Sequence, residues 1–443
     1  NSAITLDGLA VTGSIGLTTH GNGNATVVNA SAIDFATSTS GGQINATARG
    51  PITQSGVITT GAQSTWWARS TGGTDYDITL ENTSNNFVEK LIIRAANVSI
   101  KDTGTTKIGA TIVSGNYALT TTGEVTDSGN MNIEGTTTIS SSGSNIILDR
   151  SGNDFTGAVA VVGANVQLVD ANAIVLGTSD VSGTYQVRSV AGDITDTGAL
   201  TVAGTSTLET TANDASITLD QGGHAFTGAL LITTNDTGTD TLGDVTIYAG
   251  SGAALDFGAS TIDGDLIARS GHATGITDSG VVTVRGTSSS QTTATDADIS
   301  LGTSTLGDGN GTDTITLNTT GVGGNATLDN GTTAIVLGTS AASLTTSVGG
   351  DLTLQTGHAS GITDSGTVTV SRNLSATTDD NNGVINLGTL VVDGTITLAT
   401  NDDANDDSAH ATIVNTCSVC SHGLKFAAST VEGNLSATAT TGN

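Results

Sequence analysis

A phrase of five residues recurs five times along this chain and constrains its fold more than any other feature. It reads Ile-Thr-Gln-Ser-Gly in the first copy and Ile-Thr-Asp-Ser-Gly in the last two, and successive copies start 69 to 86 residues apart. The copies begin at Ile52, Val125, Ile194, Ile276 and Ile362. A repeat at such a period indicates an architecture in which each unit buries its apolar face against its neighbours. We therefore expect the first residue of every copy to lie in a stacked core.

Short runs that alternate between apolar and polar residues fill the space between the phrases. A Leu-Thr-Val or Val-Thr-Val run follows most copies, and an Ile-x-Leu run such as 217–219 comes next. Gly, Asn, Asp, Ser and Thr separate the runs, and no window has a helical spacing of apolar residues. A period of two predicts strands, and coils of about 20–25 residues have the size of one solenoid turn. The fold class predicted is all-β, a single-stranded β-solenoid of roughly 20 coils.

The repeat predicts one continuous solenoid over residues 1–443, with long units that start near the five phrases. The chain opens in the middle of a unit, at residues 4–6, and closes where the next phrase is due. Neither end has the atypical capping repeat with which solenoids cover unpaired strand edges. We therefore expect a segment of a longer chain, with end-to-end stacking of separate chains as the alternative.

The charge of the chain restricts its partners. The formal net charge is −29, with only 12 Lys and Arg residues, and clustered basic side chains are what phosphate binding needs. We therefore expect no nucleic-acid partner. No stretch approaches the ~20 apolar residues of a membrane helix, so the chain is not expected to span a membrane. Lys90, Arg94, Lys101 and Lys107 lie together and form either a solvated flank or a patch for an acidic neighbour.

The style of the repeat resembles the shaft of filamentous haemagglutinin-like adhesins, the exported partners of two-partner secretion systems. The resemblance covers nearly the whole chain and rests on Gly-, Asn-, Thr- and Ser-rich repeats with Leu-x-Val and Ile-x-Leu runs. It implies a right-handed parallel β-helix, export to a bacterial cell surface, and adhesion by a stiff extracellular fibre. The implied partners are copies of the chain or neighbouring rods, and a host, prey or partner-cell surface or polysaccharide. The family's amino-terminal secretion domain is not recognisable in this sequence.

The two cysteines of the chain, Cys417 and Cys420, lie in or beside an inserted loop of the last unit. In an exported protein a local disulfide is the leading interpretation. His410 and His422 are near enough in sequence to complete a Cys2His2 metal set, although the spacing is not that of a known zinc module.

Acidic loops are candidates for calcium, which prefers six to eight oxygen ligands. They are rich in Asp, Asn and Gly, and solvated turns without an ion are the alternative interpretation. The candidate ligands are Asp308, Asp313, Asp402, Asp403, Asp406 and Asp407.

The Asp residues of the phrase, Asp127, Asp196, Asp278 and Asp364, are the recurrent carboxylates that an enzyme could use. Carbohydrate-active β-helix lyases and hydrolases place an acid and a base close together on one face. One Asp per unit would instead stack several coils apart, as a turn residue that bonds local backbone N–H groups. We therefore expect no enzyme, and keep a carbohydrate-active enzyme or a self-assembling filament without adhesive role as alternatives.

Two adjacent tryptophans, Trp66 and Trp67, are the remaining candidate binding residues. In a strand one of them faces inward and the other outward. The outward ring could stack on a sugar or on a neighbouring rod, or cover a loop.

Overall fold

The protein is an all-β parallel β-solenoid of about 19 turns, with coils about 22 residues apart. The computed structural model describes residues 2–141, 143–237, 242–302, 304–308, 312–338, 345–379, 382–402, 408–418, 420 and 423–440, and these contain no helix. Residues 1–204 and 205–443 form two compact units, which are described in turn. The predicted fold class is thereby confirmed.

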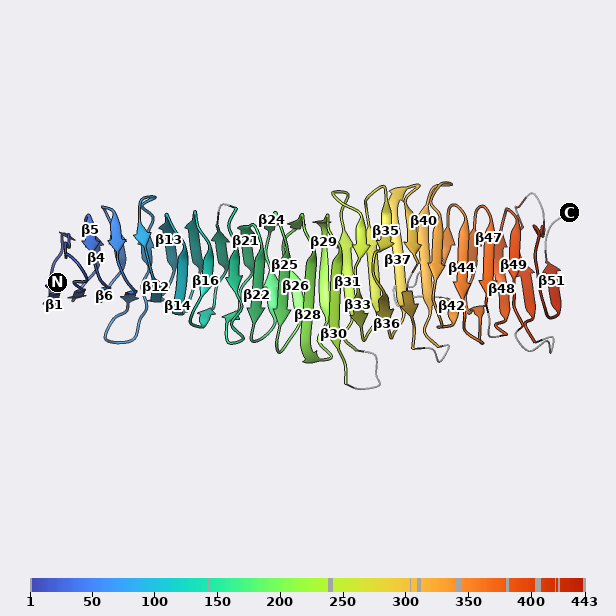
Figure 1. Cartoon of the computed structure of the whole chain (residues 1–443), viewed down its shortest axis with the longest axis horizontal. Helices are drawn as coiled ribbons and strands as arrows, with labels where there is room; N and C mark the ends of the chain where they lie inside the picture. Colours follow the sequence, from blue (N-terminus) through green and yellow to red (C-terminus); the bar gives the residue numbers. More distant parts are fainter. Residues whose placement is uncertain are drawn as a thin grey trace. The chain divides into compact units, whose positions relative to one another are not determined.

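Each coil of residues 1–204 passes through two parallel sheets, A and B (Figure 1). The strands of sheet A are β1 (Ile4–Leu9), β3 (Ala25–Asn29), β6 (Ile44–Ala48), β9 (Ser64–Ala68), β12 (Lys90–Ala95), β14 (Thr106–Val113), β16 (Val125–Asp127), β17 (Met131–Ile133), β19 (Ile146–Leu148), β20 (Asp154–Phe155), β22 (Val166–Asp170) and β25 (Tyr185–Ser189). The strands of sheet B are β2 (Ser14–Ile15), β4 (Ile33–Phe35), β7 (Ile52–Gln54), β10 (Ile78–Leu80), β13 (Val98–Asp102), β15 (Tyr117–Thr121), β18 (Thr137–Ser140), β21 (Val159–Gly163), β23 (Ile174–Leu176), β24 (Ser179–Val181), β26 (Ile194–Asp196) and β27 (Leu200–Val202). A third sheet joins β5 (Ser38–Ser40), β8 (Ile58–Thr60) and β11 (Asn86–Phe87).

Residues 205–443 repeat the same plan. The strands of sheet A are β28 (Ser206–Asn213), β30 (Leu230–Asn235), β32 (Leu255–Phe257), β33 (Ser260–Ile262), β35 (Gly275–Asp278), β36 (Val282–Val284), β38 (Asp298–Leu301), β39 (Ser304–Leu306), β41 (Ala326–Asp329), β44 (Leu352–Thr356), β47 (Leu374–Thr378) and β49 (Ile396–Ala399). The strands of sheet B are β29 (Ile217–Phe226), β31 (Val245–Ala249), β34 (Leu266–Ser270), β37 (Ser288–Thr295), β40 (Ile315–Thr320), β42 (Ile335–Leu337), β43 (Ser347–Val348), β45 (Ile362–Asp364), β46 (Val368–Val370), β48 (Ile385–Val392), β50 (Ala411–Asn415) and β51 (Leu435–Ala439).

The core is a set of columns in which every second side chain of a strand stacks on its equivalent in the next coil. The apolar residue that begins each phrase is 0% exposed in all five copies, as the sequence predicts. It pairs with the first residue of the Ile-x-Leu run one coil later, as Ile52 does with Ile78, Ile276 with Ile299 and Ile362 with Ile385. Small polar side chains occupy many of the outward positions, which face solvent, although Trp67, Ile112 and Val162 are exposed apolar exceptions.

Longer strands stack in groups of four, and each group occupies a single sheet. In residues 1–204, β3, β6, β9 and β12 form such a group in sheet A, and β13, β15, β18 and β21 form the next in sheet B. In residues 205–443, β31, β34, β37 and β40 stack in sheet B, followed by β41, β44, β47 and β49 in sheet A. The long strands therefore change sheet once per unit.

The change of sheet is made by one additional strand per unit, which we call the switch strand. The switch strands are β3, β13, β22, β31, β41 and β50. Five of them follow directly on a long strand and stack on the Ile-x-Leu strand of the coil before, as Val98 does on Ile78 and Ala411 on Ile385. Because the switch strand adds half a coil, a unit contains about three and a half coils. Successive phrases consequently lie in alternate sheets, in β7, β16 and β26 of the first compact unit and in β35 and β45 of the second.

Candidate functional site

The polar residue in the phrase fastens its own coil to the next one. Asp364 Oδ1 accepts a hydrogen bond from Gly388 N at 2.7 Å, and its Oδ2 accepts from Thr389 N at 2.8 Å and Thr389 Oγ1 at 2.7 Å. Asp278 accepts from Gly302 N at 2.9 Å in the same way. For Asp278 and Asp364 the expected bond to local backbone groups is therefore wrong: each lies at the end of its strand, but these backbone donors are 24 or 25 residues further on.

Two other copies of the phrase show the same contact with different donors. Asp127 Oδ2 accepts from Asn153 Nδ2 at 2.6 Å, and Gln54 Oε1 accepts from Asn85 Nδ2 at 2.8 Å. Burial raises the pKa of the Asp127 carboxyl. The expected single column of phrase carboxylates is also wrong, because alternate copies lie in alternate sheets. These side chains hold loops of neighbouring coils together and are not arranged as an acid–base pair on one face.

A buried Asn or Asp lies at the end of four of the six switch strands and directly after the end of a fifth, β41, and sequence reasoning missed this position. Its side-chain oxygen accepts a hydrogen bond from a backbone N–H of the preceding coil. The pairs are Asn29 with Val11 N, Asp102 with Phe87 N, Asp170 with Phe155 N, Asn330 with Leu306 N and Asn415 with Val392 N. All five are at most 4% exposed. The signal in the sequence is an Asn or Asp four residues after the first apolar residue of the strand, visible only once the switch strands are aligned.

The amide and carboxyl forms of this position differ in what they satisfy. Asn415 Nδ2 donates to the carbonyl of Val392, so one side chain bonds both backbone groups of that residue, and Asn330 does the same with Leu306. A carboxylate only accepts. Burial raises the pKa of the Asp170 carboxyl to about 6 and also raises that of Asp102. The switch strands β13 and β22 therefore keep an ionisable group where β3, β41 and β50 have an amide, and β31 has Ala249 at this position.

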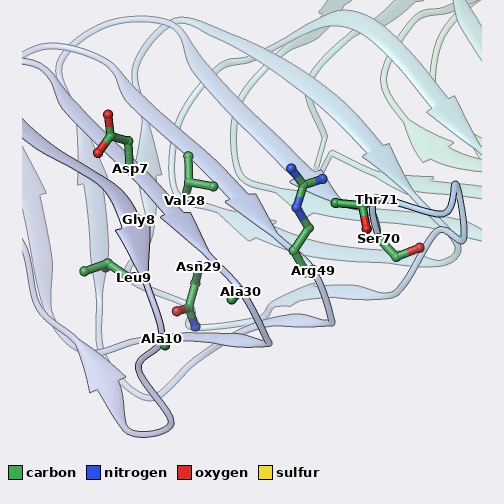
Figure 2. Close-up of a pocket in the computed structure, with 10 residues that line it drawn as sticks. All are labelled: Asp7, Gly8, Leu9, Ala10, Val28, Asn29, Ala30, Arg49, Ser70 and Thr71. Atoms are coloured by element: carbon green, nitrogen blue, oxygen red, sulfur yellow. The ribbon is translucent and has the colours of Figure 1, made fainter.

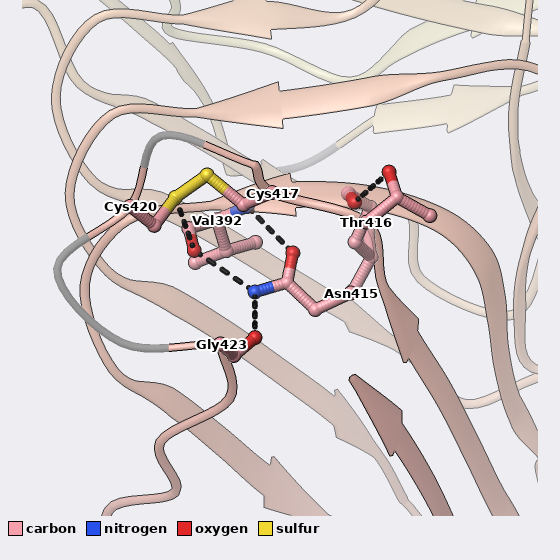
Figure 3. Close-up of a disulfide and its surroundings, with 7 residues drawn as sticks. Val392, Asn415, Thr416, Cys417, Cys420 and Gly423 are labelled. Carbon is pink, nitrogen blue, oxygen red and sulfur yellow. Dashed lines mark hydrogen bonds between the residues drawn. A yellow bond between two sulfur atoms is a disulfide. The ribbon is translucent and has the colours of Figure 1, made fainter. Parts of the chain in front are cut away.

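A disulfide joins Cys417 and Cys420 just after the last switch strand, with Cα atoms 5.6 Å apart (Figure 3). Cys417 is 2% exposed, and Asn415 beside it donates to Gly423 O at 2.8 Å. The bridge therefore closes a loop next to the buried amide of the switch strand. His422, the second histidine of the alternative metal set, lies outside the described residues.

The acidic loops that could hold calcium are only partly described. Asp313 Oδ2 accepts from Asp308 N at 3.0 Å, and burial raises the pKa of the Asp313 carboxyl. Asp402 is 8% exposed and its Oδ2 accepts from Ser408 N at 3.4 Å. Asp403, Asp406 and Asp407 lie outside the described residues. Within the described ranges no group of three or more His, Cys, Asp or Glu side chains is placed to hold a metal ion, and calcium binding stays a prediction.

The two tryptophans of β9 divide between core and surface. Trp66 is fully buried between Phe35 and Phe87, edge-on to each at 5.4 and 5.9 Å between ring centroids. Trp67 is 46% exposed on the outer side of sheet A. It is paired in register with Thr47 on one side and Arg94 on the other.

A cleft of about 350 Å³ lies beside Trp67 and is lined mainly by apolar side chains. Its lining residues are Trp67, Arg69, Ile92, Ile93, Arg94, Ala110 and Ile112. Asp75 bridges the two arginines: Arg69 Nη1 donates to its carboxylate at 2.7 Å and Arg94 Nε at 3.3 Å. Asp75 is thus paired with Arg69 of its own loop and with Arg94 of β12, one coil later, and these pairs could not be inferred from the sequence.

A second cleft, of about 660 Å³, lies on the other side of the same loop (Figure 2). Figure 2 shows Arg49 between the strand residues Val28 and Asn29 and the loop residues Ser70 and Thr71. Arg49 Nη1 donates to the carbonyl of Arg69 at 3.1 Å. The loop from Arg69 to residue 77 therefore borders both clefts. Over the part of the chain that is described, no helix has the length and apolarity needed to cross a membrane.

A family model described as "Repeats of unknown function (DUF5649)" matches residues 22–93, 95–162, 163–233 and 242–301, about 60% of the chain. Each matched segment begins three residues before a switch strand, at β3, β13, β22 and β31. One repeat of the family therefore corresponds to one group of long strands, and the switch strand is the first strand of that group. No curated protein and no solved structure matches the chain.

Proposed function

The chain belongs to this family of repeats of unknown function, and from that premise we propose that it serves as a stiff segment of an extracellular fibre on a bacterial surface, where it mediates attachment. A repeat β-solenoid is the architecture of a structural repeat protein. The finer assignment, to a surface fibre with an adhesive role, is our own.

The observation that carries the proposal is the way in which neighbouring coils are joined within each compact unit. Parallel backbone ladders join successive coils within each compact unit, and phrase residues such as Asp364 add side-chain bonds between coils. Such contacts resist bending and stretching, because deformation must break several of them together. Side chains of this kind are used for cohesion, so we propose that they perform no catalysis.

Two further features support an exported location. The local disulfide between Cys417 and Cys420 suits an oxidising compartment, since cytosolic proteins rarely keep such bonds. The net charge of −29 keeps long chains soluble and separate outside the cell. The repeat style, similar to that of filamentous haemagglutinin-like shafts, supports a bacterial surface as the site.

Immunogold electron microscopy of intact native cells tests the location and the shape together. An antibody against the purified protein should label thin filaments that extend from unpermeabilised cells. Cells treated with a surface protease serve as the control and should lose the label. Label that appears only after permeabilisation would reject the extracellular fibre, and label on globular particles would reject the fibre while keeping the location.

A further inference from the structure

The loop after β9 is longer than the equivalent loop of the coil before it. β6 ends at Ala48 and the phrase begins at Ile52, whereas nine residues separate Ala68 from Ile78 in the next coil. Those residues form a small hairpin, in which Ser70 N donates to Thr74 O at 2.8 Å and Tyr76 N to Ala68 O at 2.7 Å. Inserted loops on a repeat scaffold are common positions for binding residues.

The hairpin orients two guanidinium groups beside an exposed indole. The side chain of Asp75 in this hairpin is 12% exposed. Its carboxylate forms ion pairs with Nη1 of Arg69 and Nε of Arg94. Gly73, with φ of 95°, passes so close that an added Cβ would lie 3.1 Å from Nη2 of Arg69. Among the described residues, Nη1 and Nη2 of Arg94 and Nε1 of Trp67 have no hydrogen-bond partner. Donors fixed in place but unused by the protein are suited to a ligand.

The charge near this hairpin differs from that of the rest of the chain. Six of the 12 Lys and Arg residues lie between Arg49 and Lys107, where there are five Asp and Glu residues, although the whole chain has a net charge of −29. The negative net charge of the chain therefore repels a negatively charged ligand least in the region around this hairpin. The paired N–H groups of a guanidinium match a carboxylate in geometry as well as in charge.

We propose that the cleft beside Trp67 binds a carboxylate-bearing glycan, with one hexuronate ring stacked on the indole. The carboxylate of that ring accepts from Nη1 and Nη2 of Arg94, and Ile92 and Ile112 line the cleft beside it. A neighbouring sugar lies beyond the hairpin in the second cleft, near Arg49 and Thr71. Both clefts fall within the size range of small-ligand sites, and their concave shape favours a sugar ring over the flat face of a second copy.

This inference rests on the proposed function in one respect: it names the ligand through which the protein would attach. The cleft itself exists whether or not the protein forms a fibre. The test is a titration of the purified protein with oligogalacturonate, followed by tryptophan fluorescence. Trp66 is buried, so Trp67 is the exposed reporter. The matched ligand is the methyl ester of the same oligosaccharide, which keeps the rings and removes the charge. We expect the acid to bind at least tenfold more tightly than the ester, and less tightly as salt increases.

Three variants complete the test. Trp67→Ala, followed by calorimetry, should lower the affinity for the acid at least tenfold, and Arg94→Gln should abolish the preference for acid over ester. Val162→Ala, at an exposed apolar residue of sheet B, is the matched control and should change neither. Protease resistance of each variant shows that the fold is kept.

Equal binding of acid and ester, or no binding of either, would overturn the proposal. Loss of self-association in Trp67→Ala, measured by sedimentation, without any glycan binding would assign the cleft to a second copy. Filaments on cells without glycan binding would reject this site and keep the proposed fibre. Glycan binding without filaments on cells would reject the proposed fibre and keep this site.

Discussion

Replacement of Asp170 by Asn should stabilise the protein at neutral pH. Asp170 is fully buried at the end of β22, where its carboxyl accepts from Phe155 N and Asn172 N at 2.9 and 2.8 Å. Burial raises its pKa to about 6, because the charged form is poorly solvated there. Asn occupies the same position in three other switch strands, so the protein itself shows that the amide fits.

The size of the effect follows from the difference in proton affinity between the folded and unfolded chains. An unfolded Asp has a pKa of about 3.9, so the difference is about 2 units, or about 3 kcal/mol at 1.36 kcal/mol per unit. The folded chain binds the proton more tightly, so its stability is greatest below about pH 4. That contribution is lost as the pH rises to about 6, and stays lost above it. The amide of the Asp170→Asn variant does not titrate, and like the protonated carboxyl it keeps one carbonyl oxygen as an acceptor for Phe155 N. Its Nδ2 cannot accept from Asn172 N, and instead supplies the donor that Asn330 and Asn415 use.

Urea unfolding of the wild type and of Asp170→Asn, from pH 4 to pH 8, measures the effect. The variant should exceed the wild type by little at pH 4 and by about 3 kcal/mol at pH 7. Because repeat proteins open locally, hydrogen exchange of residues 153–172 should show the same trend. Asp180→Asn, at an exposed residue of β24, is the control and should show no such trend. A gain that does not change with pH, or a less stable variant at pH 7, would refute the reasoning.

Three further predictions test the core, the contacts between coils and the loop of the last unit. Ile276→Asp places an unpaired charge in a stacked column and should expose nearby coils to protease, whereas Ile276→Val should cost only about 1 kcal/mol in urea unfolding; equal resistance of the two variants would contradict the register. Asp364→Ala leaves two backbone N–H groups of the next coil without their acceptor and should cost about 1–3 kcal/mol, with faster hydrogen exchange at residues 388–389; unchanged exchange would show that the contact is not needed. Alkylation of the unreduced native protein should find no free thiol at Cys417 or Cys420, and two labelled thiols would reject the disulfide.

The sequence is sufficient for the fold class and for the burial of the phrase. Alternation with period two around Ile276 and Ile362 predicts inward and outward positions directly, because the side-chain period of a strand is fixed by its geometry. The coil length follows from the spacing of the turns. Neither inference needs contacts that are distant in the chain.

The change of sheet was not predictable in the same way. A switch strand such as β13 has the same alternation as the long strand β15 that stacks on it, so composition does not reveal which of them is additional. The partners of Asp364 were missed because they lie one coil away, where a local turn motif is the simpler interpretation. The pair of arginines on Asp75 was missed for the same reason, since Arg69 and Arg94 are 25 residues apart.

The half coil in each unit has a consequence for how a gene of this kind can lengthen or shorten. Recombination between two copies removes or adds one unit, and the junction still places a switch strand on an Ile-x-Leu strand, so the coil stack is not interrupted. Everything after the junction is nevertheless turned to the opposite side, because long and short strands have exchanged sheets. Only an even number of gained or lost units restores the original direction. Within one compact unit, a surface such as the one around Trp67 therefore faces the same side as a later surface, or the opposite side, according to the parity of the repeats between them.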